Sequence, residues 1–157
     1  MDNPIRTLIV AEDDLFRQET CALLENSDGV TAVGEARDEQ MAIKLIRELE
    51  PDVILLDVDT LSSGGVKIVA QINEMCPDSK IIIVSVHSQE PLLLDAFRRG
   101  AGGHLVKGKT KPLEIVEAIR AVNRGESILS PCMAGWILDE VIKIRSVELT
   151  KHGGKTT

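Results

Sequence analysis

The sequence predicts an α/β protein built on a doubly wound, five-stranded parallel sheet, with one further helix towards the C-terminus. Two observations favour this fold. Five short apolar segments alternate with five amphipathic ones over residues 5–125, a pattern typical of strands joined by right-handed helical crossovers. The run Val53-Ile54-Leu55-Leu56 is apolar at four consecutive positions, as expected for a central strand that is buried on both faces.

The predicted strands are short segments rich in aliphatic and β-branched residues. In chain order they are 5–11, 30–35, 53–57, 80–84 and 102–106. Each of the first, third, fourth and fifth segments is followed or ended by a charged or hydroxyl-bearing residue. Because ligands bind beyond the carboxyl ends of the strands in such a sheet, these residues are the first candidates for a functional site.

The predicted helices have apolar residues at helical spacing and recognisable start and stop signals. In chain order they are 15–25, 38–49, 66–75, 88–99 and 112–124. Asp14 is predicted to cap the first helix and Asp38 to open the second, while Pro112 begins the fifth and Gly125 ends it. A polar loop, 60–65, separates the third strand from its helix.

Residues 1–125 are predicted to form one domain, and residues 126–157 a linker helix and tail. The extra helix starts at Ser130-Pro131 and runs to about Arg145, with a frayed end after Val147. Its apolar residues, which include Trp136, cover more than one narrow stripe. They could pack on the first domain as ordinary core, on an absent domain, or on a second copy in a homodimer.

Composition limits the possible functions. The chain has 157 residues, 43% hydrophobic and 27% charged, with a net charge of −7, two Phe, one Trp and no Tyr. An acidic balance with few aromatic residues argues against unaided nucleic-acid binding. No signal peptide or apolar run near 18 residues is present, which predicts a cytoplasmic protein without membrane contact. The three cysteines lack paired spacing and are interpreted as reduced structural thiols.

The residues at the strand ends suggest a common chemistry. They are Glu12 and Asp13 after the first strand, Asp57 after the third, Ser85 after the fourth and Lys107 after the fifth. Three carboxylates in one crevice repel one another unless a cation joins them, and Mg²⁺ prefers such oxygen ligands. A carboxylate can accept a phosphoryl group covalently, and the metal with a lysine would neutralise its charge. Taken singly, each residue has an ordinary explanation as a helix cap or a solvated surface group; the joint pattern is much less common.

These residues resemble those of the two-component response regulator receiver domain, over about residues 4–124. The resemblance implies a flavodoxin-like (βα)₅ fold, phosphorylation of Asp57 by a sensor histidine kinase, and no enzyme activity beyond autophosphorylation and autodephosphorylation. It implies no organic cofactor. The implied metal is Mg²⁺, with Asp13 as a direct ligand, Glu12 acting through water, and Asp57 and the backbone carbonyl of Asp59 completing the set.

The same resemblance assigns two switch residues and a subfamily. Ser85 corresponds to the switch hydroxyl, Lys107 to the lysine that contacts the phosphoryl group, and His104 to the aromatic switch position. Residues 117–131 are similar to the NarL/FixJ type, whose members usually control transcription through a C-terminal helix-turn-helix. Leu149-Thr150 resembles its opening, but too few residues follow to form a DNA-binding domain, so DNA contact would require a domain that is absent or truncated here.

Some positions depart from the family pattern. Thr60-Leu61 stands where Met-Pro is usual, and Val86 follows the switch hydroxyl where a small residue is usual, which is expected to slow access to the site. Asp59 and His87 flank the position of the attacking water in the family, and an acid there could either orient water or repel hydroxide.

Two alternatives remain open. A degenerate or stand-alone receiver could act as a docking module without taking phosphate. The segment Asp57-Val58-Asp59-Thr60-Leu61 is also similar to the first motif of haloacid-dehalogenase-like phosphatases, although that motif normally lies on the first strand and its Thr falls one residue later.

Overall fold

The computed structural model describes residues 3–59, 67–86, 90–129 and 131–155. Within them lies one five-stranded sheet with strand order β2-β1-β3-β4-β5, in which every neighbouring pair is parallel. The strands are β1 (Ile5–Val10), β2 (Val30–Ala36), β3 (Val53–Asp57), β4 (Lys80–Ser85) and β5 (Gly103–Val106). The strand order is that of a flavodoxin-like doubly wound sheet, which confirms the predicted fold.

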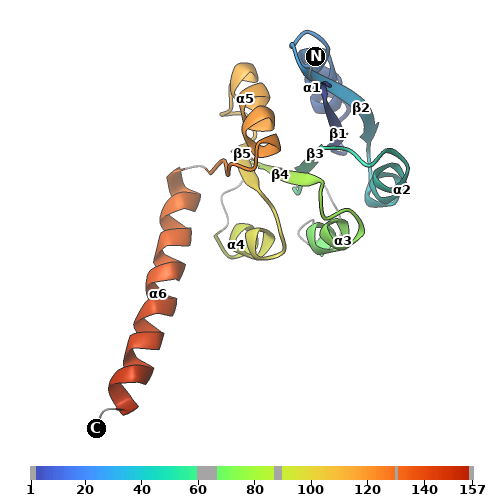
Figure 1. The fold of residues 1–157 in the computed structure, drawn as a ribbon. Helices are drawn as coiled ribbons and strands as arrows, with labels where there is room; N and C mark the ends of the chain where they lie inside the picture. Colours follow the sequence, from blue (N-terminus) through green and yellow to red (C-terminus); the bar gives the residue numbers. More distant parts are fainter. Residues whose placement is uncertain (1–2, 60–66, 87–89, 130, 156–157) are drawn as a thin grey trace.

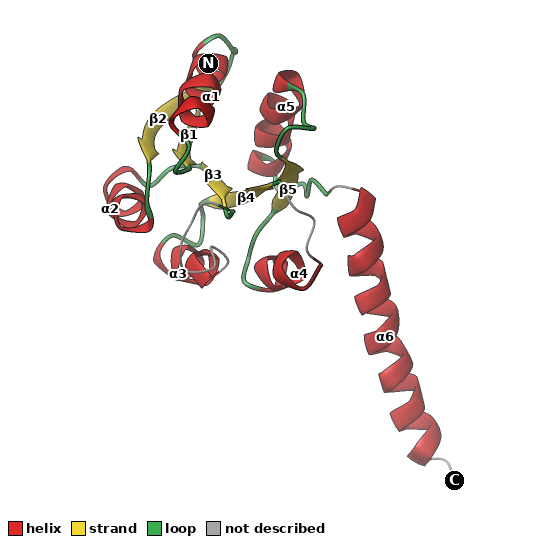
Figure 2. Ribbon diagram, turned by 180° about the vertical axis from the view of Figure 1, so that it is seen from behind, coloured by secondary structure: helices red, strands yellow, loops and turns green. Residues whose placement is uncertain are grey.

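Helices cover both faces of this sheet (Figures 1 and 2). They are α1 (Asp14–Glu25), α2 (Glu39–Leu49), α3 (Lys67–Met75), α4 (Glu90–Arg98), α5 (Pro112–Asn123) and α6 (Pro131–Lys155). Helices α1 and α5 lie on one face, and α2, α3 and α4 on the other, as Figure 2 shows. Asp38 caps α2 as predicted, its carboxylate accepting the N–H of Met41 at 2.8 Å.

The central strand supplies side chains to both layers of the core. Ile54 and Leu56 pack with the α2, α3 and α4 side, whereas Val53 and Leu55 pack with the α1 and α5 side. All four are at most 1% exposed, which accounts for the unbroken apolar run in the sequence. Asp57, the last residue of the strand, is therefore fixed by well-packed neighbours on both sides.

The C-terminal helix is longer than predicted and begins on the domain. Met133 is fully buried, and Trp136 and Ile137 pack against the core cluster on the α4 side. Arg98 of α4 forms an ion pair with Glu140 at 2.8 Å. The helix then extends away from the sheet (Figure 1) and reaches Lys155, ten residues beyond the predicted end at Arg145.

Its outer part carries apolar residues that are more than half exposed: Leu138, Val141, Ile142, Ile144 and Val147. The first turns of α6 thus pack on the domain, as one of the three predicted arrangements required. The rest does not.

Several predictions fall on residues that the structure does not describe. They concern the 60–65 loop, Val66, His87 and Ser88. Cys21 and Cys76 are free thiols, as predicted. In the described part of the chain, no helix is both long enough and apolar enough to cross a membrane.

Candidate functional site

The carboxyl ends of the parallel strands meet at one edge of the sheet. Asp57 ends β3 and pairs in register with Val84 of β4. Ser85 ends β4 and pairs with Val106 of β5, and the N–H of Lys107 donates to the Ser85 carbonyl oxygen at 2.9 Å. The topology therefore gathers at one edge the strand-end residues that the sequence singled out.

The Asp57 carboxylate is fully buried, and both of its oxygens accept hydrogen bonds. Oδ2 accepts from the Lys107 ammonium at 2.8 Å, and Oδ1 accepts from the backbone N–H of Asp59 at 3.1 Å. A buried carboxylate is costly unless a cation and hydrogen bonds compensate it. Lys107 is therefore both its counter-ion and the group that orients it.

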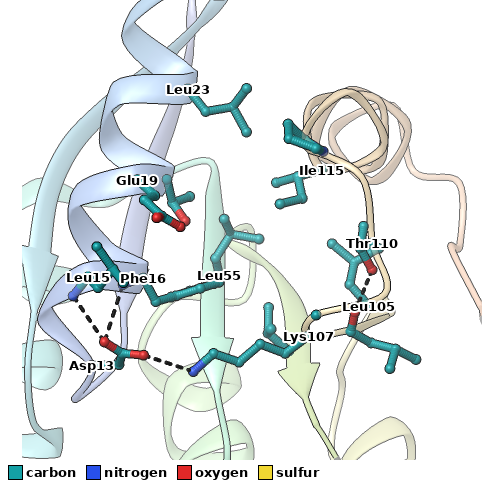
Figure 3. A pocket seen from close by; sticks show the side chains of 15 residues that line it. Asp13, Leu15, Phe16, Glu19, Leu23, Leu55, Leu105, Lys107, Thr110 and Ile115 are labelled. Atoms are coloured by element: carbon teal, nitrogen blue, oxygen red, sulfur yellow. Dashed lines mark hydrogen bonds and ion pairs between the residues drawn. The ribbon is translucent and has the colours of Figure 1, made fainter.

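Asp13 shares the same lysine, as Figure 3 shows. Its Oδ2 lies 3.7 Å from the Lys107 Nζ, and its Oδ1 accepts the backbone N–H groups of Leu15 at 3.0 Å and Phe16 at 3.3 Å. The bond from the Phe16 N–H is the main cause that holds the pKa of Asp13 below its usual value, with Leu15 and Lys107 adding to it.

These bonds make Asp13 the N-cap of α1, so the predicted cap at Asp14 is wrong. Asp14 is the first helical residue, and its side chain pairs with Arg17 instead. The difference of one residue in the position of the cap affects the site. As the N-cap, Asp13 has one oxygen bonded to the start of the helix, and its other oxygen is directed at Lys107.

Lys107 has a third contact that sequence reasoning missed. Its ammonium lies 4.8 Å from the centroid of the Phe16 ring, within cation–π range. The side chain is 19% exposed. An ordinary surface lysine samples many rotamers, whereas this one is held between a buried carboxylate, an exposed one and an aromatic face.

Ser85 is turned towards Asp59. The Ser85 hydroxyl, in a residue only 1% exposed, donates to Asp59 Oδ1 at 3.1 Å. The backbone N–H of Val86 donates to the other oxygen of the same carboxylate. Asp59 is itself exposed. The family resemblance assigns its backbone carbonyl to the metal and places its side chain beside the attacking water, and it does not predict a bond to β4. The Asp59 side chain bridges the ends of β3 and β4.

His104 lies in β5 and is 1% exposed. Burial lowers the pKa of its imidazole below the ordinary value of 6.5, against a smaller opposing effect of the Asp59 carboxylate. Its backbone N–H donates to the carbonyl oxygen of Ile128 at 2.8 Å, so the segment before α6 lies along β5.

A buried arginine fixes the acidic turn after β1, and the sequence analysis missed it. Arg17 donates to the carbonyl oxygens of Ala11 at 2.6 Å and Glu12 at 3.0 Å, and it pairs with Glu35 at 3.0 Å and with Asp14. The spacing of the sequence could have indicated that this arginine is buried. Residues 17, 20 and 24 share one face of α1 at helical spacing, and in the structure all three are buried.

The donor groups fit a divalent cation in part. Asp13 and Asp57 both direct an oxygen at one ammonium, so their carboxylates already converge on a positive charge. Glu12, which precedes Asp13 in the chain, is exposed. Among the described residues, however, no group of three or more acidic, histidine or cysteine side chains is arranged around a common point. Asp13 and Asp57 are the residues that would hold Mg²⁺, and the full set with Glu12 and Asp59 stays a prediction.

An apolar recess adjoins this charged edge (Figure 3). It has a volume of about 330 Å³ and lies between α1 and α5. Leu23, Leu55 and Ile115 are among its walls, while Asp13 and Lys107 lie at one end.

Sheet order, acidic turn, buried aspartate and paired lysine together define a doubly wound α/β domain with one charged site at the carboxyl ends of its strands. The chain matches the family model described as the response regulator receiver domain over residues 7–120. It belongs to this family of two-component systems, whose members are typically not true enzymes and generally bind Mg²⁺ at the phosphorylation site.

Curated relatives agree with the NarL/FixJ type that the sequence indicated. The chain is 35% identical to the response regulator GacA of Pseudomonas viridiflava over 130 residues, which cover 83% of this chain and 60% of GacA. It is 30% identical to the probable transcriptional regulatory protein NarL of Mycobacterium tuberculosis, covering 90% of this chain and 67% of that protein. The chain thus spans less than two thirds of the length of GacA.

Solved structures agree as well. A LuxR-family response regulator from Aurantimonas superposes with a TM-score of 0.79 at 30% identity, covering 89% of this chain and 99% of that one. The signal receiver domain of the putative response regulator NarL from M. tuberculosis gives 0.74 at 29% identity, covering 80% of this chain and 100% of that one.

Proposed function

We propose that Asp57 of this receiver domain accepts a phosphoryl group from a sensor histidine kinase in a Mg²⁺-dependent reaction. The observation that carries the proposal is the fully buried Asp57 carboxylate at the end of the central strand, 2.8 Å from an ammonium that it shares with Asp13. A carboxylate buried at that edge and held by a lysine is oriented for covalent chemistry.

In the proposed step, an Asp57 carboxylate oxygen attacks the phosphorus of a phosphohistidine. A P–O bond forms, the P–N bond breaks, and the electron pair leaves with the imidazole nitrogen. Hydrolysis later returns the carboxylate and releases inorganic phosphate. The Lys107 ammonium moves from the Asp57 carboxylate to the phosphoryl oxygens and neutralises their charge, while Asp13 keeps its ion pair with Lys107. Bound Mg²⁺ supplies further positive charge to the oxygens of the transferred group.

Phosphorylation of Asp57 would then change the positions of Ser85 and of the buried ring of His104. Both side chains are at most 1% exposed, so a shift in either must displace packed neighbours. By analogy with the relatives, the output is control of transcription through a DNA-binding domain outside this chain, with homodimerisation as a further proposal.

Intact mass spectrometry after incubation with acetyl phosphate and Mg²⁺ tests this function. The unmodified chain should gain one phosphoryl mass, Asp57→Asn should gain none, and chelation of Mg²⁺ should abolish the gain. Asp78→Asn is a matched control, because Asp78 is an exposed carboxylate before β4, at the opposite end of the strands. An equal gain in Asp57→Asn, or none in the unmodified chain, would refute the proposal.

One observation favours a second candidate, a receiver that serves as a docking module without phosphorylation. The Ser85 hydroxyl, which a phosphoryl group would need, is held by Asp59. Absence of beryllofluoride binding in the presence of Mg²⁺ would favour this candidate. The phosphatase alternative loses its basis, since the chain belongs to the receiver family.

A further inference from the structure

The Asp59 side chain has a place at the site that neither the fold nor the family pattern requires. Both carboxylate oxygens accept hydrogen bonds from the end of β4, one from the Ser85 hydroxyl at 3.1 Å and one from the Val86 N–H. Its own N–H donates to Asp57 Oδ1 at 3.1 Å. Asp59 therefore joins the phosphoacceptor on β3 to the first residue after β4.

The two donors that it holds belong to the two residues that follow the register partner of Asp57. Asp57 pairs with Val84 of β4, and Ser85 and Val86 come next in the chain at the same end of the sheet. A hydroxyl and a backbone N–H each have one proton to donate. Either can serve the Asp59 carboxylate or a phosphoryl oxygen on Asp57, but not both at full strength. The Lys107 ammonium has three protons and is under no such restriction.

We propose that the Asp59 carboxylate is a built-in competitor of the phosphoryl group, a positioning residue that holds Ser85 and Val86 until phosphorylation takes these donors from it. The inference rests on the proposed function and concerns the regulation of the same site. This role differs from the two that the sequence left open for this acid, because it concerns the donors of β4 and not the attacking water.

Competition has a measurable cost. Charge-assisted hydrogen bonds are stronger than neutral ones. The two bonds that Ser85 and Val86 donate to Asp59 are of this kind, and both must be broken before these donors can bond to a phosphoryl group. Like charges also repel, although Asp59 is exposed and solvent weakens that effect. At saturating Mg²⁺, Asp59→Ala should therefore bind beryllofluoride about tenfold more tightly and accept phosphoryl from acetyl phosphate about tenfold faster. Asp78→Asn should do neither, since it removes an equal charge at the far edge.

A cycle with Ser85→Ala separates competition for donors from simple repulsion. If Asp59 acts by holding the hydroxyl, the gain from Asp59→Ala should shrink at least about threefold when the hydroxyl is already absent. Repulsion alone would leave the gain unchanged. Equal gains in the two backgrounds would therefore overturn the proposal.

A spectroscopic measurement tests the contact without metal or phosphate. The Val86 amide proton should resonate downfield in the unmodified chain, because it is bonded to a carboxylate, and should move upfield in Asp59→Ala, whose side chain carries no acceptor. An unmoved resonance would overturn the proposal. Equal phosphorylation rates in the unmodified chain and Asp59→Ala would do so too, whereas absence of phosphorylation in every variant would refute the proposed function itself.

Discussion

Replacement of Arg17 by Met tests whether the acidic turn depends on a buried guanidinium. Methionine keeps most of the apolar stem and removes every hydrogen-bond donor. The carbonyl oxygens of Ala11 and Glu12 lose their side-chain donor, and Asp14 and Glu35 lose their counter-ion. The turn that carries Asp13 then lacks the two hydrogen bonds from Arg17 that hold its backbone in place.

The expected loss of stability follows from the exposure of each partner. Ala11 is fully buried, so its unpaired carbonyl should cost about 1 to 3 kcal/mol. The Asp14 and Glu35 side chains are 75% and 45% exposed and can regain water, so each ion pair contributes roughly 1 kcal/mol or less. The free energy of unfolding should therefore fall by about 2 to 4 kcal/mol.

Urea denaturation followed by far-UV circular dichroism measures this loss. The slope for a protein of this size is about 1 to 3 kcal/mol per molar urea, so the midpoint should fall by roughly 1 to 2 M. Arg124→Met is the matched control, because Arg124 and its partner Glu126 are both 57% exposed. If the two variants unfold within about 0.5 kcal/mol of each other, the argument from burial is wrong.

Four further perturbations have definite expected outcomes. Burial and a hydrogen bond to Glu35 raise the pKa of Cys21 to about 11, so its alkylation at pH 8 should be about a hundredfold slower than that of a thiol with a pKa of 9.0; equal rates would contradict this. Because burial lowers the pKa of His104 below 6.5, the unfolded chain binds the extra proton, so the free energy of unfolding should fall as the pH drops below about 6.5. Chemical denaturation at pH 7.5 and 5.5 should show that His104→Phe loses part of this dependence. Met133→Ala should cost about 2 to 4 kcal/mol in a urea titration because Met133 is fully buried, and a loss below about 1 kcal/mol would mean that α6 does not need this anchor. Val86→Ala, at a side chain that is 50% exposed, should speed phosphoryl gain or loss in a time course, and unchanged rates would show that its bulk does not limit access.

The sequence predicted what depends on local pattern. The order of strands and helices, the central position of the 53–57 strand and the meeting of Asp13, Asp57, Ser85 and Lys107 all follow from periodicity and parallel topology. Sheet register then brings residues that are far apart in the chain to one edge.

What the sequence could not predict depends on side-chain direction. Asp13 and Asp14 are both good caps, and only the path of the chain after β1 makes Asp13 the cap. Arg17 looks like a surface residue until its carbonyl partners are known. The orientation of the Asp59 carboxylate towards β4 likewise depends on the turn after β3, for which sequence offers no rule.

The attachment of α6 beside β5 has a mechanical consequence. Ile128 bridges to Gly103 and accepts the His104 N–H, so the base of the helix is tied to the strand that leads to Lys107. Beyond the ion pair at Glu140, the 15 residues to Lys155 extend about 22 Å at 1.5 Å per residue. A tilt of about 5° where the helix leaves α4 moves its far end by about 2 Å, which amplifies a sub-ångström adjustment of the domain into a larger displacement at the end of α6.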